Sequence, residues 1–184
     1  MRVFGPVPSR RFGRSLGINN IPPKTCSYSC IYCQLGRTTC MSVERTAFYQ
    51  PNELIGEARK AIAAIEGQGE TIDYLTFVPD GEPTLDSNLG KEISLAKETG
   101  HKVAVITNGS LLWDPTVREG LSVADAVSVK VDAADKATWR AIDRPHRALD
   151  FDEVLNGILI FADEYNGTLL TETMLIGGVN DGTQ

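Results

Sequence analysis

The sequence has little histidine: His101 and His146 are the only two in 184 residues. We find no Ser-His-Asp or Cys-His constellation around them, which argues against hydrolytic chemistry that needs a histidine base. The sequence also lacks an apolar run close to the roughly 18 residues that a membrane span needs. Its first residues, from Met1 to Pro6, show no apolar signal-peptide core. These absences favour a cytoplasmic protein that does not enter a membrane.

Acidic side chains are scarce in the first third of the chain. Residues 1–60 carry nine basic and three acidic side chains, whereas residues 61–184 carry nine basic and twenty-one acidic ones, for a net charge of −6. A positive N-terminal third suits the phosphates of a nucleotide or an RNA, although an ordinary basic surface gives the same count. The net negative charge of the whole chain argues against a large, non-specific nucleic-acid binding surface.

The composition, 42% hydrophobic and 23% charged, is typical of one globular domain over residues 1–184. Residues 1–25 are predicted to be a loop-rich lead-in around one short strand near 15–19, because Pro, Gly, Arg and Asn are frequent there. Apolar periodicity then predicts helices at 51–65, 87–99, 115–120, 134–145 and 151–165, and strands at 74–78, 102–107, 124–131 and 168–176.

Strands that alternate with helices predict an α/β fold with a parallel sheet and helical crossovers. Periodicity leaves open whether the sheet is doubly wound or a partial barrel. In both architectures ligands bind beyond the carboxyl ends of the strands. Polar and glycine-containing segments stand at those ends, at 80–82, 107–109, 130–132 and 177–178. We therefore expect the site at this edge of the sheet.

All four cysteines lie between positions 26 and 40, which indicates metal or redox chemistry because disulfides are rare in a reducing compartment. Cys26, Cys30 and Cys33 have the spacing C-x3-C-x2-C. Three thiolates can bind three corners of a 4Fe–4S cluster and leave the fourth iron open, whereas most electron-transfer clusters use four cysteines. Structural zinc with Cys40 as fourth ligand is the alternative, but no second C-x2-C pair exists. Cys40 is expected to be a free or half-buried thiol.

The run C-x3-C-x-aromatic-C resembles the signature of the radical S-adenosylmethionine (SAM) superfamily. The surrounding block is similar to a subgroup of Fe–S oxidoreductases related to wyosine-forming tRNA enzymes and the molybdopterin-precursor synthase; it comprises residues 5–11, 15–19 and 33–37. The resemblance implies a partial (β/α) barrel, a 4Fe–4S cluster on Cys26, Cys30 and Cys33, and SAM on the fourth iron. The family barrel usually has six strand–helix units. Only five strands are predicted here, so the chain is either truncated or an unusually short member.

The resemblance also implies roles for residues at the strand ends. Gly81, Glu82 and Pro83 match the family's Gly-Gly-Glu-Pro run, which receives the methionine ammonium, with Asp80 in place of the first glycine. Tyr32 matches a position that contacts adenine. The positions that usually contact ribose or the methionine carboxylate are Thr107, Asn108, Ser128, Lys130 and Asp132. Residues 176–180 resemble the glycine-containing stretch that supports adenine.

Two ionisable side chains stand in strands that should be buried, and we predict that both serve catalysis. Lys130 shares a strand face with Ser128 and Asp132, and it is costly to bury unless it is paired. An ion pair with Asp132 or Glu82 is the structural alternative. Glu172 is a candidate to face the substrate, with a salt bridge to Lys130 as its alternative. Residues 144–147, Arg-Pro-His-Arg, form either a phosphate- or carboxylate-binding segment or, as we favour, a solvated joint between helices.

These patterns together predict a radical SAM enzyme. The resemblance implies that one electron, from a donor such as a ferredoxin or flavodoxin, drives cleavage of SAM to methionine and a 5′-deoxyadenosyl radical, which removes hydrogen from a small-molecule or nucleotide substrate. A tRNA substrate is the first alternative, consistent with the basic arm at Arg10, Arg11, Arg14 and Arg37. A non-catalytic zinc or Fe–S module is the second.

Overall fold

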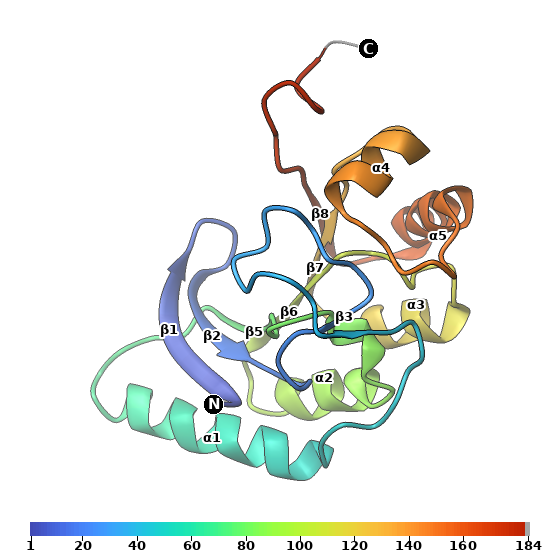
Figure 1. Cartoon of the computed structure of the whole chain (residues 1–184). Helices are drawn as coiled ribbons and strands as arrows, with labels where there is room; N and C mark the ends of the chain where they lie inside the picture. Colours follow the sequence, from blue (N-terminus) through green and yellow to red (C-terminus); the bar gives the residue numbers. More distant parts are fainter. Residues whose placement is uncertain (183–184) are drawn as a thin grey trace.

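The computed structural model of the chain, which describes residues 1–182, contains a six-stranded sheet in the order β1-β2-β5-β6-β7-β8 (Figure 1). The strands are β1 (Val3–Ser9), β2 (Gly13–Ile18), β5 (Tyr74–Phe77), β6 (Lys102–Thr107), β7 (Ala126–Lys130) and β8 (Thr168–Glu172). The last five run parallel, and β1 pairs antiparallel with β2. A small separate ladder joins β3 (Thr25–Cys26) to β4 (Cys40–Met41), one at each end of the cysteine loop.

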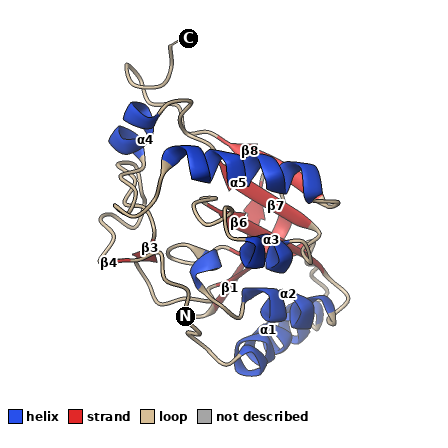
Figure 2. Ribbon diagram, turned by 90° about the vertical axis from the view of Figure 1, so that its right-hand side faces the viewer, coloured by secondary structure: helices blue, strands red, loops and turns tan. Residues whose placement is uncertain are grey.

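The long helices cover one face of this sheet. Figure 2 shows α1 (Pro51–Glu66), α2 (Leu89–Lys97), α3 (Pro115–Leu121) and α5 (Phe151–Glu164) side by side in front of the strands. The 3-10 helix η1 (Pro83–Leu85) follows β5, and α4 (Lys136–Ile142) follows β7. Because the helices lie on one face only, the sheet is a partial barrel and not a doubly wound sheet. The predicted fold class is confirmed.

Alternation along the strands separates an apolar face from a polar one. Val105 on β6 and Val127 on β7 pack into the main core beneath the helices. Their neighbours Ala104 and Ala126 point to the opposite face, where they meet Phe12 from the β1–β2 turn. This inner face carries small and polar side chains, and the functional cavity opens at its carboxyl end.

The N-terminal segment differs from the sequence prediction. Residues 1–25 were expected to be loop-rich with one strand, yet Val3–Ser9 forms a second strand that pairs with β2. Pro6 and Pro8 concealed it, because proline cannot donate to a ladder and normally marks a break. β1 tolerates them because it is the edge strand of the sheet, with an irregular register between Phe4 and Val7.

The other edge of the sheet is β8. It ends at Glu172, whereas the sequence predicted a strand that continues to 176, and β7 covers only 126–130 of the predicted 124–131. No described strand pairs with the outer side of β8, so its residues are half-buried or exposed. The expectation that Glu172 stands in a buried strand is therefore wrong. Among the residues described here, no helix is both long and apolar enough to cross a membrane.

Candidate active site

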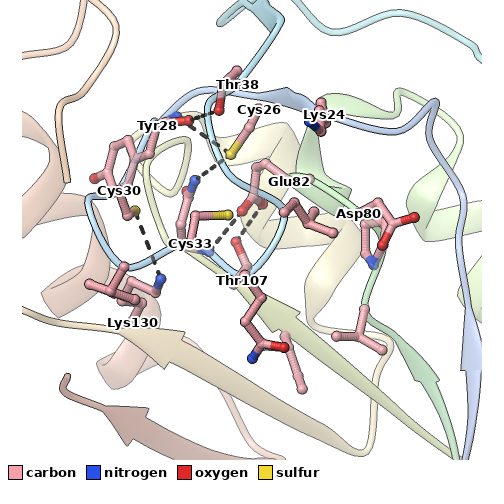
Figure 3. A pocket seen from close by; sticks show the side chains of 18 of the residues that line it. Lys24, Cys26, Tyr28, Cys30, Cys33, Thr38, Asp80, Glu82, Thr107 and Lys130 are labelled. Carbon is pink, nitrogen blue, oxygen red and sulfur yellow. Dashed lines mark hydrogen bonds between the residues drawn. The ribbon is translucent and has the colours of Figure 1, made fainter.

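A cavity of about 440 Å³ opens at the carboxyl ends of the parallel strands, beneath the cysteine loop (Figure 3). It brings together most of the residues that the sequence predicted, from segments that lie far apart along the chain. Those that line it are Cys26, Cys30, Tyr32, Cys33, Gly81, Glu82, Thr107, Asn108, Lys130 and Glu172. The predicted site therefore forms one continuous surface.

The three predicted cluster ligands are free, half-buried cysteines on this surface. Cys26 ends β3 and its Sγ lies 3.6 Å from Nδ2 of Asn108, while Sγ of Cys30 lies 3.9 Å from Nζ of Lys130. Burial raises the pKa of the Cys26 thiol to about 12 and that of the Cys30 thiol well above its usual range. Cys40 is exposed on β4 and does not line the cavity.

This donor set fits an iron–sulfur cluster better than a zinc ion. No three or more His, Cys, Asp or Glu side chains between residues 1 and 182 are close enough to share a single metal ion. A structural zinc needs four converging ligands, whereas a cubane takes one thiolate at each separate iron. Three thiols around one cavity, with Cys40 outside it, therefore suit three irons and leave the fourth for another ligand.

Glu82 is buried at the floor of the cavity, with 1% of its surface exposed. Its Oε1 accepts hydrogen bonds from the Thr84 N–H (3.1 Å), the Thr84 hydroxyl (2.6 Å) and the Thr107 hydroxyl (2.6 Å), and its Oε2 accepts one from the Asn108 N–H (2.7 Å). Burial raises the pKa of this carboxyl, and these donors oppose that rise. Glu82 thus ties the loop after β5 to the end of β6 while its carboxylate faces the cavity.

Gly81 allows the loop after β5 to touch the cysteine loop. A Cβ at this position would lie 1.9 Å from the carbonyl oxygen of Thr25. The neighbouring Glu82 N–H donates to that same oxygen at 3.1 Å. Asp80, which replaces the family's first glycine, does not have a positive φ. Its backbone N–H donates a 3.3 Å hydrogen bond to Oδ1 of Asn19. A side chain at position 80 is therefore compatible with this loop.

Lys130 is held by groups other than those that the sequence suggested. Its Nζ lies 4.7 Å from the centre of the Tyr32 ring, and no described carboxylate forms a salt bridge with it. The predicted alternatives, ion pairs with Asp132, Glu82 or Glu172, are thus wrong. Asp132 instead accepts a hydrogen bond from the Tyr32 hydroxyl. Burial, and secondly this hydrogen bond, raise the pKa of Tyr32 well above its usual range.

Arg11 from the β1–β2 turn reaches across the inner face of the sheet to β7 and β8. Its Nη1 donates to Oγ of Ser128 at 2.9 Å and to Oε2 of Glu172 at 2.5 Å. Arg11 also lines the cavity. Glu172 therefore does face the cavity, but its partner is an arginine that lies 161 positions earlier in the chain.

Residues 20–183 match the family model described as the radical SAM superfamily. The chain belongs to this superfamily. A 4Fe–4S cluster and SAM are the cofactors of radical SAM enzymes, so the predicted enzyme class and cofactors are confirmed.

Two curated relatives and one solved structure are similar to this chain. A UPF0026 protein of Methanocaldococcus jannaschii is 50% identical over 96% of the chain and 54% of its own length. A SAM-dependent nucleotide dehydratase of Selenomonas ruminantium is 26% identical over 78% of the chain and 50% of its own length. The solved structure of TYW1 with a lysine-pyruvate adduct has a TM-score of 0.62 at 18% identity, covering 91% of this chain and 57% of that one. The chain spans about half the length of these curated relatives.

Several predicted residues of this radical SAM domain do not line the cavity. Pro83 is buried where η1 begins, and Ser128 lies beneath Arg11. Asp132 is buried behind Tyr32, and the 176–180 stretch is tied to it because Nδ2 of Asn180 donates to the Asp132 carbonyl oxygen at 2.9 Å. These residues support the walls of the site and are not exposed in the cavity.

Sequence reasoning also missed residues of the site. Oδ1 of Asp143 lies 3.3 Å from the Cys30 thiol, and Ser27 and Ser110 share a buried hydrogen bond of 2.6 Å beneath the cysteine loop. The indole of Trp139 donates to the Tyr28 hydroxyl at 3.0 Å. No motif or periodicity indicates such pairs, because each joins residues more than 80 positions apart.

Proposed function

We propose that this chain is the core of a radical SAM enzyme in which Cys26, Cys30 and Cys33 bind three irons of the cluster. One observation carries the proposal: the three thiols share a single cavity with the buried carboxylate of Glu82 and the polar ends of β6 and β7. When bound, the cluster and SAM supply a 5′-deoxyadenosyl radical that takes a hydrogen atom from the substrate.

The side chains around the thiols prepare the cavity for charged groups. The Lys130 ammonium lowers the pKa of the Cys30 thiol against the stronger effect of burial, so it favours the thiolate that iron requires. Glu82 is the acceptor for the methionine ammonium of SAM, because its Oε2 receives only one hydrogen bond from residues 1–182. Thr107 and Asn108 fix that carboxylate, and Asn108 also orients towards Cys26.

We assign the substrate side of the cavity to Arg11 and Glu172. A guanidinium with only Nη1 bonded to described residues keeps donors for a carboxylate or phosphate of the substrate. A small-molecule or nucleotide substrate is our proposal, and the similarity to a nucleotide dehydratase supports the nucleotide class. A tRNA is the second candidate, favoured by the surplus of basic residues in the first sixty positions.

Anaerobic reconstitution of the full-length protein tests this function. We expect about four irons per chain, visible absorbance of an iron–sulfur cluster, and 5′-deoxyadenosine formation once a reductant is added. Replacing Cys30 by Ser should abolish all three. The matched variant Cys40→Ser should leave them unchanged, because Cys40 lies outside the cavity. Colourless protein with one zinc that is lost in Cys40→Ser would instead establish the non-catalytic module.

A further inference from the structure

The cysteine loop is attached to a second loop, residues 142–147, by a series of backbone hydrogen bonds. The N–H groups of Ser29 and Ile31 donate to the carbonyl oxygens of Asp143 and Ile142 at 3.0 and 2.9 Å. In the other direction, the N–H of His146 donates to the Ser27 carbonyl oxygen at 2.8 Å. The two loops are therefore joined side by side, on the segment that carries the three cysteines.

Arg144 supports the view that this contact is functional. Its φ of 45° places a non-glycine residue in the left-handed region, which costs free energy unless the surroundings impose it. The Ser29 N–H lies 3.3 Å from the Arg144 carbonyl oxygen, so the cysteine loop helps to impose it. The backbone of Arg144, whose side chain is exposed, is therefore held against the cysteine loop.

Exposed positive charge gathers on these two loops. Arg37, Arg144 and Arg147 are exposed, and none forms an ion pair with a described residue; we call these three the basic face. By contrast, Arg2, Arg14 and Arg59 on other parts of the surface are each paired with a glutamate. No aspartate or glutamate occurs before Glu44, so the cysteine loop carries no carboxylate beside the basic face.

Apolar side chains lie beside the basic face. Ile31 and Leu35, on the same loop as the cysteines, are 43% and 36% exposed. Exposed apolar groups that are bordered by arginine are typical of surfaces that bind another protein. A phosphate backbone would make no use of Ile31, so this combination favours a protein partner over RNA.

We propose that the basic face docks an acidic one-electron carrier protein, the physiological reductant of the cluster; this inference rests on the proposed function. The reduced carrier gives one electron to the cluster and is itself oxidised by one electron. With the cluster and SAM bound, this electron would supply the one-electron reduction that cleaves the C5′–S bond to methionine and the 5′-deoxyadenosyl radical. No further oxidant or reductant is needed for this balance.

Charge complementarity supports an acidic partner at the basic face. The chain carries a net charge of −6, so most of its surface repels an acidic protein while the basic face attracts one. Docking here also places the carrier against the loop that bears the three thiols. Steering of this kind raises association rates by about 10- to 1,000-fold and weakens as salt screens the charges.

The test compares two reductants of the full-length, reconstituted enzyme. A reduced flavodoxin serves as the acidic carrier, and reduced methyl viologen, a small cation, bypasses docking. In the double variant Arg37→Gln/Arg147→Gln we expect flavodoxin-supported 5′-deoxyadenosine formation at low salt to fall about tenfold, with a weaker dependence on salt than the parent. The methyl viologen rate should stay within about twofold of the parent.

The control variant Lys60→Gln/Lys91→Gln removes the same charge from exposed positions on α1 and α2 and should leave both rates unchanged. Equal loss in both double variants would mean that only net charge matters, which overturns the proposal. An unchanged flavodoxin rate in the Arg37/Arg147 variant also overturns it, as does loss of RNA binding with an intact flavodoxin rate. If methyl viologen supports no cleavage even in the parent, the proposed function fails and not the docking site.

Discussion

At the scale of single residues, Glu82 has two roles, and the sequence indicated only one of them. The resemblance assigns it to the methionine ammonium, and the structure shows that it also joins Thr84, Thr107 and Asn108. Any test of its role in binding SAM must therefore keep the shape of the side chain.

Replacing Glu82 by Gln keeps that shape but removes the charge. We expect SAM to bind at least about tenfold more weakly, because a neutral amide is a poorer partner for an ammonium. Turning the amide nitrogen towards the Asn108 N–H also leaves a donor unpaired, at a cost of about 1–3 kcal/mol in unfolding free energy. Binding titrations, denaturation and iron analysis measure the three quantities, and iron content should not change.

Glu98→Gln, a change in an exposed ion pair with Arg59, provides the control and should alter none of these values. Unchanged SAM affinity in Glu82→Gln would contradict the assigned role. Loss of iron in that variant would show that the acid is needed for the cysteine loop alone.

The sequence predicted those site residues that belong to a short local motif. Cys26, Cys30 and Cys33 stand within eight positions, and Glu82 lies in the short loop that follows the predicted strand 74–78. Arg11 and Asp143 were missed because each reaches the site from a distant segment, and nothing in its own neighbourhood indicates a partner. From the sequence, Arg11 is assigned only to a basic arm that a tRNA substrate could contact, with no partner inside the chain.

At the scale of elements, the approach of the loop after β5 to the cysteine loop depends on one missing side chain. We expect Gly81→Ala to lower the unfolding free energy by about 2–3 kcal/mol, because its Cβ would collide with the Thr25 carbonyl oxygen and break the Glu82 hydrogen bond. Urea denaturation measures the loss, and iron uptake should fall with it.

Gly56→Ala is the matched control for that substitution. Gly56 lies inside α1, and a Cβ there meets no atom within 4 Å. The same chemical change should therefore stabilise the protein by about 0.5–1 kcal/mol through better helix propensity. Equal effects at both glycines would show that the contact at Gly81 is not tight.

Helices and strands were predicted correctly from the sequence where apolar periodicity agrees with the residues that begin or end an element. The helices and parallel strands were located because apolar spacing and flanking Gly, Pro or Asp coincide, as at the ends of α1 and α5. The strand β1 was not predicted, because its prolines normally disfavour strand pairing. The strand β8 was predicted to be too long, because apolar residues continue past Glu172 outside the sheet. Burial and pairing decide these cases, and both depend on the rest of the fold.

At the scale of the whole molecule, a buried acid between α2 and the sheet should make stability depend on pH. Glu92 is fully buried, and neither of its carboxylate oxygens has a hydrogen-bond partner among residues 1–182. Burial, assisted by the nearby Asp86, raises its pKa from 4.5 to about 8. The protonated form is thus the one that the fold favours.

When folding raises the pKa of an acid, the contribution of that acid to stability is fully present below its pKa in the unfolded state. This contribution is lost as the pH rises through its pKa in the folded state. We therefore expect the unfolding free energy to fall, by on the order of 3 kcal/mol, between about pH 5 and pH 9. Glu92→Gln, which mimics the protonated acid, should flatten that fall, as measured by urea denaturation of the metal-free protein. A decline of the same size in the variant would assign it to other groups.

The backbone bonds between the cysteine loop and residues 142–146 also have a consequence for biogenesis. The cysteines emerge from the ribosome before the segment that braces them, which is made more than a hundred residues later. Until then the thiols belong to an unsupported stretch of nascent polypeptide. Maturation of the metal centre should therefore be largely post-translational, and stalled chains that end before residue 142 should acquire little iron.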